Sequence, residues 1–212
     1  MRLLTFSTLF PNAERQSHGI FVATRLRYLL GSGQVESRVV APVPWFPFRH
    51  ARFGEYASFA KVPAKDTRFG IEVTHPRYPL IPKIGMTLAP WYMAKAVKPV
   101  IRQIIDDGYD FDLIDAHYFY PDGVAAVMLG RHFNKPVVIT ARGTDINLIP
   151  QHPLARRMIL WAGKHGKGMI TVCNALKVGM VGQGVVASRI TPLRNGVDLQ
   201  LFQPGDRAGL RA

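Results

Sequence analysis

Short apolar runs alternate along the chain with longer segments in which apolar residues recur at every third or fourth position. The short runs predict strands and the longer periodicity predicts amphipathic helices. The predicted strands are Arg2–Thr8, Ser37–Ala41, Asp112–Ala116, Pro136–Thr140, Gly168–Val172 and Arg189–Leu193. The predicted helices are Ile20–Leu30, Leu88–Asp107, Gly123–Phe133, Leu154–His165 and Asn174–Gln183. Strands that alternate with helices predict a Rossmann-like α/β fold, with a doubly wound, mainly parallel sheet and helices on both faces.

The loops after the predicted strands are the places where we expect a ligand. In doubly wound sheets, ligands bind outside the carboxyl ends of the strands. Functional side chains are therefore expected shortly after residues 8, 41, 116, 140, 172 and 193.

Residues 42–88 interrupt this alternation. The segment is rich in proline, aromatic and basic residues, and within it only Ile71–His75 predicts a strand. Residues 45–105 contain ten Lys and Arg against three Asp and Glu, more than half of the chain's excess positive charge. Aromatic residues beside cations are typical of surfaces that bind anionic membranes. A long loop folded back on its own aromatic side chains explains the pattern equally well. The residues expected to face a membrane are Trp45, Phe46, Phe48, Arg49 and Arg52.

The composition is that of a globular protein with an anionic partner. Of the 212 residues, 48% are hydrophobic and 19% are charged, which excludes a disordered, collagenous or coiled-coil chain. The formal net charge is +13, so phosphates, acidic lipids or nucleic acid are the partners to consider. No nucleic-acid-binding motif accompanies the charge, and we therefore expect no nucleic-acid partner. The sequence predicts no particular oligomeric state.

Cysteine content and hydropathy predict a cytoplasmic protein, peripheral on the inner face of the membrane if the basic aromatic segment binds lipid. Cys173 is the single cysteine and cannot form an internal disulfide. The longest uncharged stretches have 11 residues, whereas a membrane-spanning helix needs about 20 apolar ones. The apolar start of the chain has one basic residue and no small-residue cleavage site, so we interpret it as a buried strand.

The first loop has His18 and Gly19 at the start of a predicted helix. A glycine there lets a phosphate approach the backbone N–H groups at the positive end of the helix dipole. A plain turn explains the glycine as well. The sequence has neither the Gly-x-Gly-x-x-Gly pattern of dinucleotide-binding folds nor a P-loop in this position.

Polar residues also follow the strands predicted to end at residues 116 and 140. His117 can donate a hydrogen bond to a substrate, or it can satisfy a backbone carbonyl. Asp122 is placed to cap the next helix. Arg142 offers a planar fork of donors that suits phosphate or carboxylate. Asp145 can hold Arg142, hold a substrate hydroxyl or cap a helix.

Four motifs in order extend these features over nearly the whole chain: a strand ending at His117, then Pro136–Asp145, Gly168–Leu176 and Arg194–Pro204. Together they resemble the amino-terminal half of a family 4 retaining glycosyltransferase of the two-Rossmann-domain (GT-B) type. The resemblance implies an acceptor-binding domain over residues 1–194. It also implies that residues 195–212 are a linker towards a nucleotide-sugar-binding domain outside this chain.

The resemblance implies an activity: a hexosyl unit moves from a nucleotide-sugar donor to a lipid-linked or polysaccharide acceptor, with retention of configuration and without a metal or other cofactor. The chain by itself is expected to be inactive. His117 is implied to stabilise the reacting centre, and Arg142 replaces a histidine that is common in the family. The implied donor- and acceptor-binding residues are His18, Gly19, Tyr118, Arg142, Gly143, Thr144, Asp145 and Asn195. The alternative is a non-catalytic α/β module that binds a phosphate ligand or a membrane surface.

Overall fold

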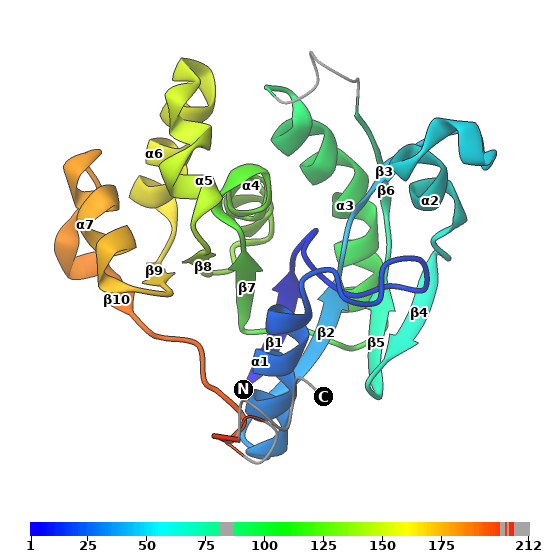
Figure 1. Cartoon of the computed structure of the whole chain (residues 1–212), viewed down its shortest axis with the longest axis horizontal. Helices are drawn as coiled ribbons and strands as arrows, with labels where there is room; N and C mark the ends of the chain where they lie inside the picture. The colour runs from blue at the N-terminus through cyan, green and yellow to red at the C-terminus, as the bar shows by residue number, and fades with distance from the viewer. Residues whose placement is uncertain (81–86, 200–201, 203, 206–212) are drawn as a thin grey trace.

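The computed structural model describes residues 1–80, 87–199, 202 and 204–205, and its strands form two sheets (Figure 1). The strands are β1 (Arg2–Phe6), β2 (Glu36–Val40), β3 (Val43–Trp45), β4 (Lys65–Arg68), β5 (Ile71–Thr74), β6 (Arg77–Pro79), β7 (Leu113–His117), β8 (Val137–Ala141), β9 (Gly168–Thr171) and β10 (Ile190–Pro192). The helices are α1 (Ile20–Gly31), α2 (Glu55–Lys61), α3 (Ala89–Asp106), α4 (Val124–Phe133), α5 (Thr144–Asn147), α6 (Pro153–His165) and α7 (Asn174–Gly182).

The larger sheet has eight strands in the order β10-β9-β8-β7-β1-β2-β5-β4. Neighbouring strands are parallel except for β4, which pairs antiparallel with β5. Strand β1 pairs with β2 on one side and with β7 on the other, so the strand order reverses between β1 and β7. A ligand crevice is expected beside this reversal, at the edge where the parallel strands end. We call this edge the carboxyl edge.

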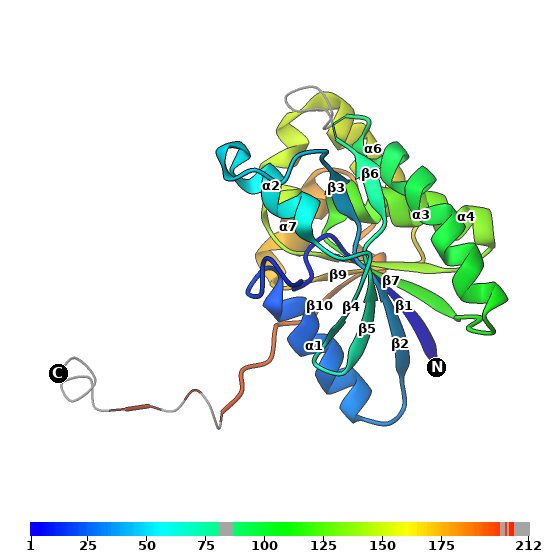
Figure 2. The same cartoon turned by 90° about the vertical axis from the view of Figure 1, so that its right-hand side faces the viewer.

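Helices cover both faces of the sheet, as the sequence predicted (Figure 2). On one face, α1 buries Val22, Ala23 and Leu26 against Val39 and Val73 of the sheet. On the other face, α3, α4 and α6 lie side by side over a larger core. The sheet is therefore covered on both sides, which explains why all residues of β1 after Arg2 are buried.

The sequence of α3 shows why such a segment becomes a core-facing helix. Met93, Val97, Ile101 and Ile104 are buried. Their spacing of three and four residues puts them on one face of the helix, towards the sheet. Pro90 lies in the first turn, where the missing backbone N–H leaves no hydrogen bond unmade.

The predicted strands and helices outside residues 42–88 are confirmed, with each end within two residues of the prediction. The largest difference is at the first strand, which was expected to reach Thr8 and ends at Phe6. The strand predicted over Ile71–His75 is β5 and ends at Thr74.

The interpretation of residues 42–88 as mainly irregular is wrong. The described part of this segment contains β3, α2, β4, β5 and β6. The parallel pair β3–β6 continues the β2–β5 pair beyond the large sheet, because Ala41 N–H binds the Thr74 carbonyl and Val43 N–H binds the Pro76 carbonyl. With α2 against β3, this pair forms a lobe that rises above the carboxyl edge (Figure 1, upper right). We call it the β3–β6 lobe.

After β10, the described residues form neither helix nor strand and run past the exposed side of α1. The Tyr28 hydroxyl of α1 donates to Asp198 Oδ2 at 3.3 Å. The predicted linker, residues 195–212, lies partly outside the described residues. None of the helices in the described part of the chain is long and apolar enough to cross a membrane.

Candidate functional site

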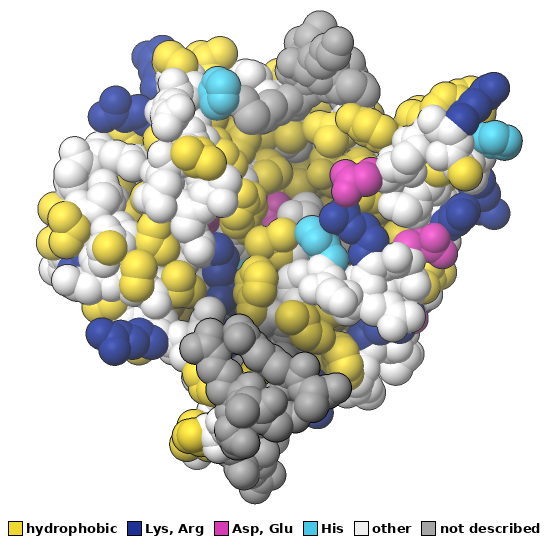
Figure 3. Space-filling view, viewed as in Figure 1, with side chains coloured by type: hydrophobic (Ala, Val, Ile, Leu, Met, Phe, Trp, Pro, Cys, Tyr) yellow, Lys and Arg dark blue, Asp and Glu magenta, His cyan; other side chains and the backbone are white. Residues whose placement is uncertain are grey.

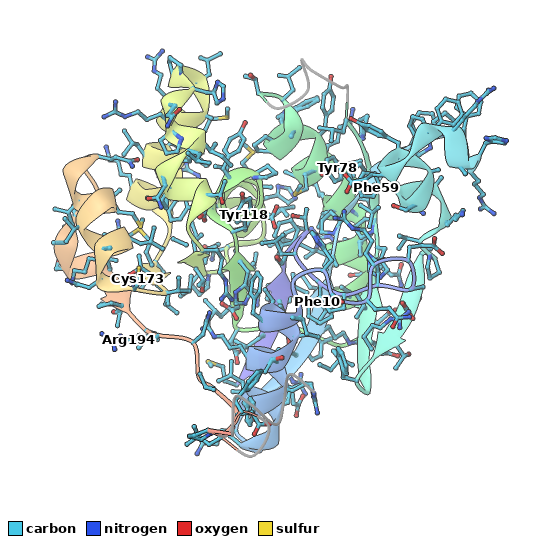
Figure 4. The ribbon with its side chains drawn as sticks, viewed as in Figure 1. Phe10, Phe59, Tyr78, Tyr118, Cys173 and Arg194 are labelled. Carbon is cyan, nitrogen blue, oxygen red and sulfur yellow. The ribbon has the colours of Figure 1, made fainter. Side chains whose placement is uncertain are left out.

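Three loops meet at the carboxyl edge, and they follow the adjacent strands β1, β7 and β8. The first leads into α1, the second is a π-helical turn over Phe119–Gly123, and the third leads into α5. In Figure 4, Tyr118 marks the start of the second loop, above β7. The strand order alone therefore brings together the loops in which the sequence predicted functional residues.

His117 ends β7 and is buried, with a side chain 2% exposed. Its Nε2 lies 3.1 Å from Asp115 Oδ2, and Arg142 Nη2 lies 2.7 Å from its Nδ1. Asp115 and His117 share a face of the sheet because residues two apart in a strand point to the same side. Both ring nitrogens are thus occupied within the protein. The expected role of His117 at the reacting centre stays a prediction.

The charges in this chain of contacts follow from its burial. Burial by itself would raise the pKa of Asp115, but His117, Arg25 and Arg142 together lower it to about 2. Burial lowers the pKa of His117 against the opposite effect of the Asp115 carboxylate, and the two arginines act in the same direction as burial. At neutral pH, Asp115 is therefore a carboxylate and His117 is a neutral imidazole. Burial, with the nearby Arg25, lowers the pKa of Arg142 to about 10, which leaves that guanidinium charged.

The guanidinium of Arg142 contacts residues from distant parts of the sequence. Its Cζ lies 4.8 Å from the ring centroid of Phe21 in α1, and its Nη1 donates to Asn195 Oδ1 at 3.2 Å. Its Nε is buried and has no hydrogen-bond partner among the described residues. Arg25, one turn further along α1, donates to Thr140 Oγ1 at 3.0 Å. Arg142, His117 and Asn195, all predicted site residues, therefore lie together.

Asp145 ties two loops to each other. It is fully buried, and its carboxylate accepts the backbone N–H groups of Phe119 (2.6 Å), Arg142 (3.0 Å) and Gly143 (2.7 Å). Burial raises the pKa of Asp145, against the effect of these hydrogen bonds. The structure shows a role that the sequence did not suggest: Asp145 holds the loops after β7 and β8 together.

Asp122 ties the loop after β1 to the loop after β7. Its carboxylate accepts the backbone N–H of Thr8 at 2.6 Å and the Thr8 hydroxyl at 2.9 Å, and Ser7 Oγ lies 3.4 Å away. Burial raises the pKa of Asp122 to about 7. The prediction that Asp122 caps the next helix is wrong, because α4 has no side-chain cap and the carboxylate points to Ser7 and Thr8 instead.

Gly19 precedes α1 with φ of 65°, a backbone conformation that favours glycine. A Cβ on this residue would lie 2.2 Å from the carbonyl oxygen of Leu9, so no side chain fits. His18 is half-buried, and burial followed by Arg15 lowers the pKa of its ring. Phe21 brings the first turn of α1 against Arg142. The expected contacts of His18 and Gly19 with substrate stay predictions.

The remaining predicted residues of the site line its outer part. Tyr118 is half-buried with φ of 80°, hydrogen-bonds the exposed Thr144, and has a pKa raised by burial. Gly143 has φ of 141°, and no atom lies within 4 Å of where a Cβ would stand. The expected contacts of Tyr118, Gly143 and Thr144 with substrate stay predictions.

The residues expected to face a membrane belong to the β3–β6 lobe and its connection to α2. Trp45 and Phe48 are more than half exposed, and Arg49 and Arg52 are exposed as well. Phe46 is half-buried and packs against Phe48, Phe53 and Tyr56. Basic and apolar surface lie next to each other on this lobe (Figure 3, upper right). The aromatic residues thus form their own cluster and still leave two large rings exposed. That these residues face a membrane stays a prediction.

Two of the hollows among the described residues lie beside α3. A groove of about 620 Å³ separates the first turns of α3 and α6, and Leu88, Trp91, Leu154 and Arg157 line it. A cavity of about 540 Å³ lies between the second half of α3 and the strands β2, β4 and β5, and no predicted site residue lines it. Within the described ranges, no three His, Cys, Asp or Glu residues cluster closely enough to hold a metal ion.

Several residues of the site were not predicted from the sequence. Asp115 could have been predicted from the two-residue period of a strand, because a charged residue two positions before His117 shares its face of the strand. Ser7 and Thr8 were assigned to the first strand, although they form the start of its loop. Arg25 and Phe21 carry no comparable signal, because their role depends on how α1 lies across β8.

Comparison with known proteins shows the family. Residues 19–201 match the model of Glycosyltransferase Family 4, and the chain belongs to this family. It is 28% identical over 155 residues to a Bacillus subtilis (strain 168) protein named "Putative teichuronic acid biosynthesis glycosyltransferase TuaC". That match covers 72% of this chain and 39% of the relative, so the chain spans well under half of the relative's length.

Solved structures show the same fold. Sucrose-phosphate synthase (tll1590) from Thermosynechococcus elongatus matches with a TM-score of 0.64 at 11% identity, over all of this chain and 52% of that one. Anabaena Alr3699/HepE in complex with UDP matches with a TM-score of 0.54 at 14% identity, over all of this chain and 49% of that one. The Rossmann-like fold of this chain thus corresponds to about half of each, as in a GT-B protein.

Proposed function

We propose that the protein is a retaining glycosyltransferase that moves a hexosyl unit from a nucleotide-sugar to a lipid-linked or polysaccharide acceptor. The observation that carries the proposal is the Arg142–His117 cluster at the carboxyl edge of a family 4 chain, beside the reversal of strand order. The relative's name mentions teichuronic acid biosynthesis, which supports a cell-envelope polysaccharide as product. Anabaena Alr3699/HepE has been solved in complex with UDP and with UDP-glucose, which supports a nucleotide-sugar donor.

This chain supplies mainly the acceptor side of the reaction in our proposal. The groove between α3 and α6 is apolar, with Arg157 at its side, and it opens where these helices start. An apolar groove with one cation suits a lipid-linked acceptor that carries phosphate. The 212-residue chain should accordingly bind nucleotide-sugars weakly, with dissociation constants in the millimolar range or above. Micromolar binding of UDP-hexoses in calorimetry contradicts this division of roles.

A transfer assay tests the activity in the protein at its natural length. Labelled UDP-, GDP- and ADP-hexoses are offered with bacterial lipid extract or polysaccharide fragments, and the product's anomeric configuration is compared with the donor's by NMR. We expect transfer with retention, unaffected by EDTA. Arg142→Met should lower the rate, whereas Arg131→Gln, an exposed residue of α4, should leave it unchanged. Absence of transfer from every donor, or an inverted product, contradicts the proposal.

The β3–β6 lobe and its exposed rings are proposed to dock on the anionic inner face of a membrane. Trp45 and Phe48 offer apolar surface, and Arg49 and Arg52 offer charge beside it. Each cation near such a surface contributes about 1 kcal/mol, and salt screens this contribution. Arg49→Ser/Arg52→Ser should therefore weaken vesicle binding about 30-fold at low salt.

Vesicle sedimentation with anionic and neutral lipids tests the docking. Trp45→Ser/Phe48→Ser should weaken binding even where salt screens the charges. The matched control is Arg131→Ser/Lys164→Ser, which removes two exposed cations from the far ends of α4 and α6. If the unaltered chain ignores anionic vesicles at low salt, or the control binds as weakly as the arginine variant, the lobe is not a membrane surface.

A further inference from the structure

The contacts of His117 leave its imidazole fully occupied inside the protein. Asp115 is a carboxylate and can only accept, so the nitrogen facing it, Nε2, carries the proton. Arg142 can only donate, so Nδ1 is the accepting nitrogen. For this neutral tautomer to touch a substrate, it would have to give up one of two buried hydrogen bonds, each costly to lose.

Arg142, unlike His117, has a hydrogen-bond donor that is not used within the described part of the protein. Its Nε is buried and unpartnered, and its Nη1 holds only the exposed Asn195. No Asp or Glu of the described residues lies within 4 Å of the guanidinium nitrogens of Arg142 or Arg25. Two guanidiniums share the neighbourhood of the Asp115 carboxylate. The Asp145 carboxylate also favours the charged form of Arg142, but it accepts backbone N–H groups and pairs with neither guanidinium.

Resting on the function proposed above, we infer that Arg142 is the anion-binding group of this site and takes a phosphate or diphosphate group of a substrate. Asp115 and His117 are positioning residues. Asp115 holds the imidazole in the tautomer whose Nδ1 accepts from Arg142 Nη2, and the imidazole holds the guanidinium over Phe21. Because the imidazole that holds Arg142 is neutral, it orients the guanidinium without neutralising its charge. This arrangement keeps the guanidinium free for a phosphate.

Conservative replacement separates a positioning role of His117 from a direct one. In His117→Gln, the amide can donate to Asp115 and accept from Arg142, whereas in His117→Leu neither contact is possible. We expect His117→Gln to keep kcat/KM within about tenfold of the unaltered protein, and His117→Leu to lose on the order of 100-fold. Arg142→Met should lose as much as His117→Leu, and the double variant no more than either.

The matched control is His132→Gln, an exposed histidine at the far end of α4. If His117→Gln loses as much as His117→Leu, the imidazole itself acts on the substrate and the inference is overturned. A small effect of Arg142→Met beside a large effect of His117→Leu overturns it as well.

A binding experiment on the 212-residue chain tests the inference without activity. Millimolar inorganic pyrophosphate should shift the Arg142 Nε–H signal in NMR spectra of the unaltered chain and of His117→Gln. In His117→Leu, the affinity should fall about tenfold. UDP and farnesyl diphosphate then distinguish the nucleotide from a lipid as the source of the diphosphate, since tighter binding of one identifies it. If none of the three probes moves the Arg142 signal, the inference fails.

The two experiments keep this inference separate from the proposed function. Pyrophosphate binding that depends on Arg142, in a protein that transfers no sugar, supports the anion site and contradicts the glycosyltransferase. Sugar transfer in a protein whose Arg142 signal ignores every probe supports the enzyme and overturns the anion site.

Discussion

Two kinds of buried aspartate stand at the same edge of the sheet, and they are held in opposite ways. Asp115 lies beside the imidazole of His117, with Arg25 and Arg142 nearby, and its pKa is lowered to about 2. Asp122 and Asp145 accept hydrogen bonds only from neutral backbone and hydroxyl groups, and burial raises the pKa of each.

The difference shows that burial alone does not decide what a carboxylate does. Neutral donors satisfy the oxygen atoms of Asp122 and Asp145 but do not balance their charge, so these residues serve to tie loops. Cations near Asp115 balance its charge, and that charge orients an imidazole and an arginine. The loop ties support stability, whereas the contacts of Asp115 position the arginine that we propose binds an anion.

The largest expected effect is at Asp145. Asp145→Ala leaves the backbone N–H groups of Phe119, Arg142 and Gly143 without their acceptor. Each buried donor without a partner costs about 1–3 kcal/mol, so the free energy of unfolding should fall by about 5 kcal/mol. Urea unfolding measures this, with Asp106→Ala, an exposed residue of α3, as a control expected within about 0.5 kcal/mol. Equal costs for the two variants would contradict the loop tie.

The second effect is a pH dependence caused by Asp122. Because its pKa is raised from 3.8 to about 7, the folded chain binds one proton more than the unfolded chain between these values. The free energy of unfolding therefore falls as the pH rises through this window, by roughly 4 kcal/mol at most. Asp122→Asn lacks this slope. The stability advantage of the unaltered chain over the variant should be largest near about pH 4 and shrink towards about pH 8; a constant difference rules the shift out.

Asp115 should show the opposite pH dependence and a smaller effect. Its pKa falls from 3.8 to about 2 on folding, so its contribution is fully present above about pH 4 and is lost as the pH falls through about 2. The difference corresponds to about 2 kcal/mol. Asp115→Asn should accordingly be less stable than the unaltered chain by about this amount at neutral pH. The gap should close in acid, and a gap that widens in acid would reverse our assignment of charge.

The smallest effect is expected for an aspartate at the surface. Asp110 pairs with Lys135 Nζ at 2.6 Å, and its side chain is 67% exposed. Solvent screens such a pair, so Asp110→Asn should change the free energy of unfolding by about 0.5 kcal/mol or less. Comparison of Asp110→Asn with the variants of the buried aspartates separates the effect of burial from that of the residue type. A loss as large as that of Asp115→Asn would remove burial as the explanation.

Much of the fold was predictable because it depends on local periodicity. The apolar spacing of Met93, Val97 and Ile101 identifies a helix face without knowledge of its partner. By contrast, β3 and β6 are three residues each and pair Val43 with Arg77, so neither segment has a pattern long enough to predict a strand. The sheet that builds the β3–β6 lobe was therefore not predicted from the sequence.

The site divides in the same way. The sequence by itself determined that His117 and Arg142 follow neighbouring strands, because parallel strands in alternation with helices end at one edge. Only the tertiary structure decided that Arg142 binds His117, lies over Phe21 and leaves its Nε free, and that Asp145 reaches Phe119, 26 residues away. The physical reason is that strand and helix periodicities are written in neighbouring residues, whereas a hydrogen bond between loops depends on the packing of the whole sheet.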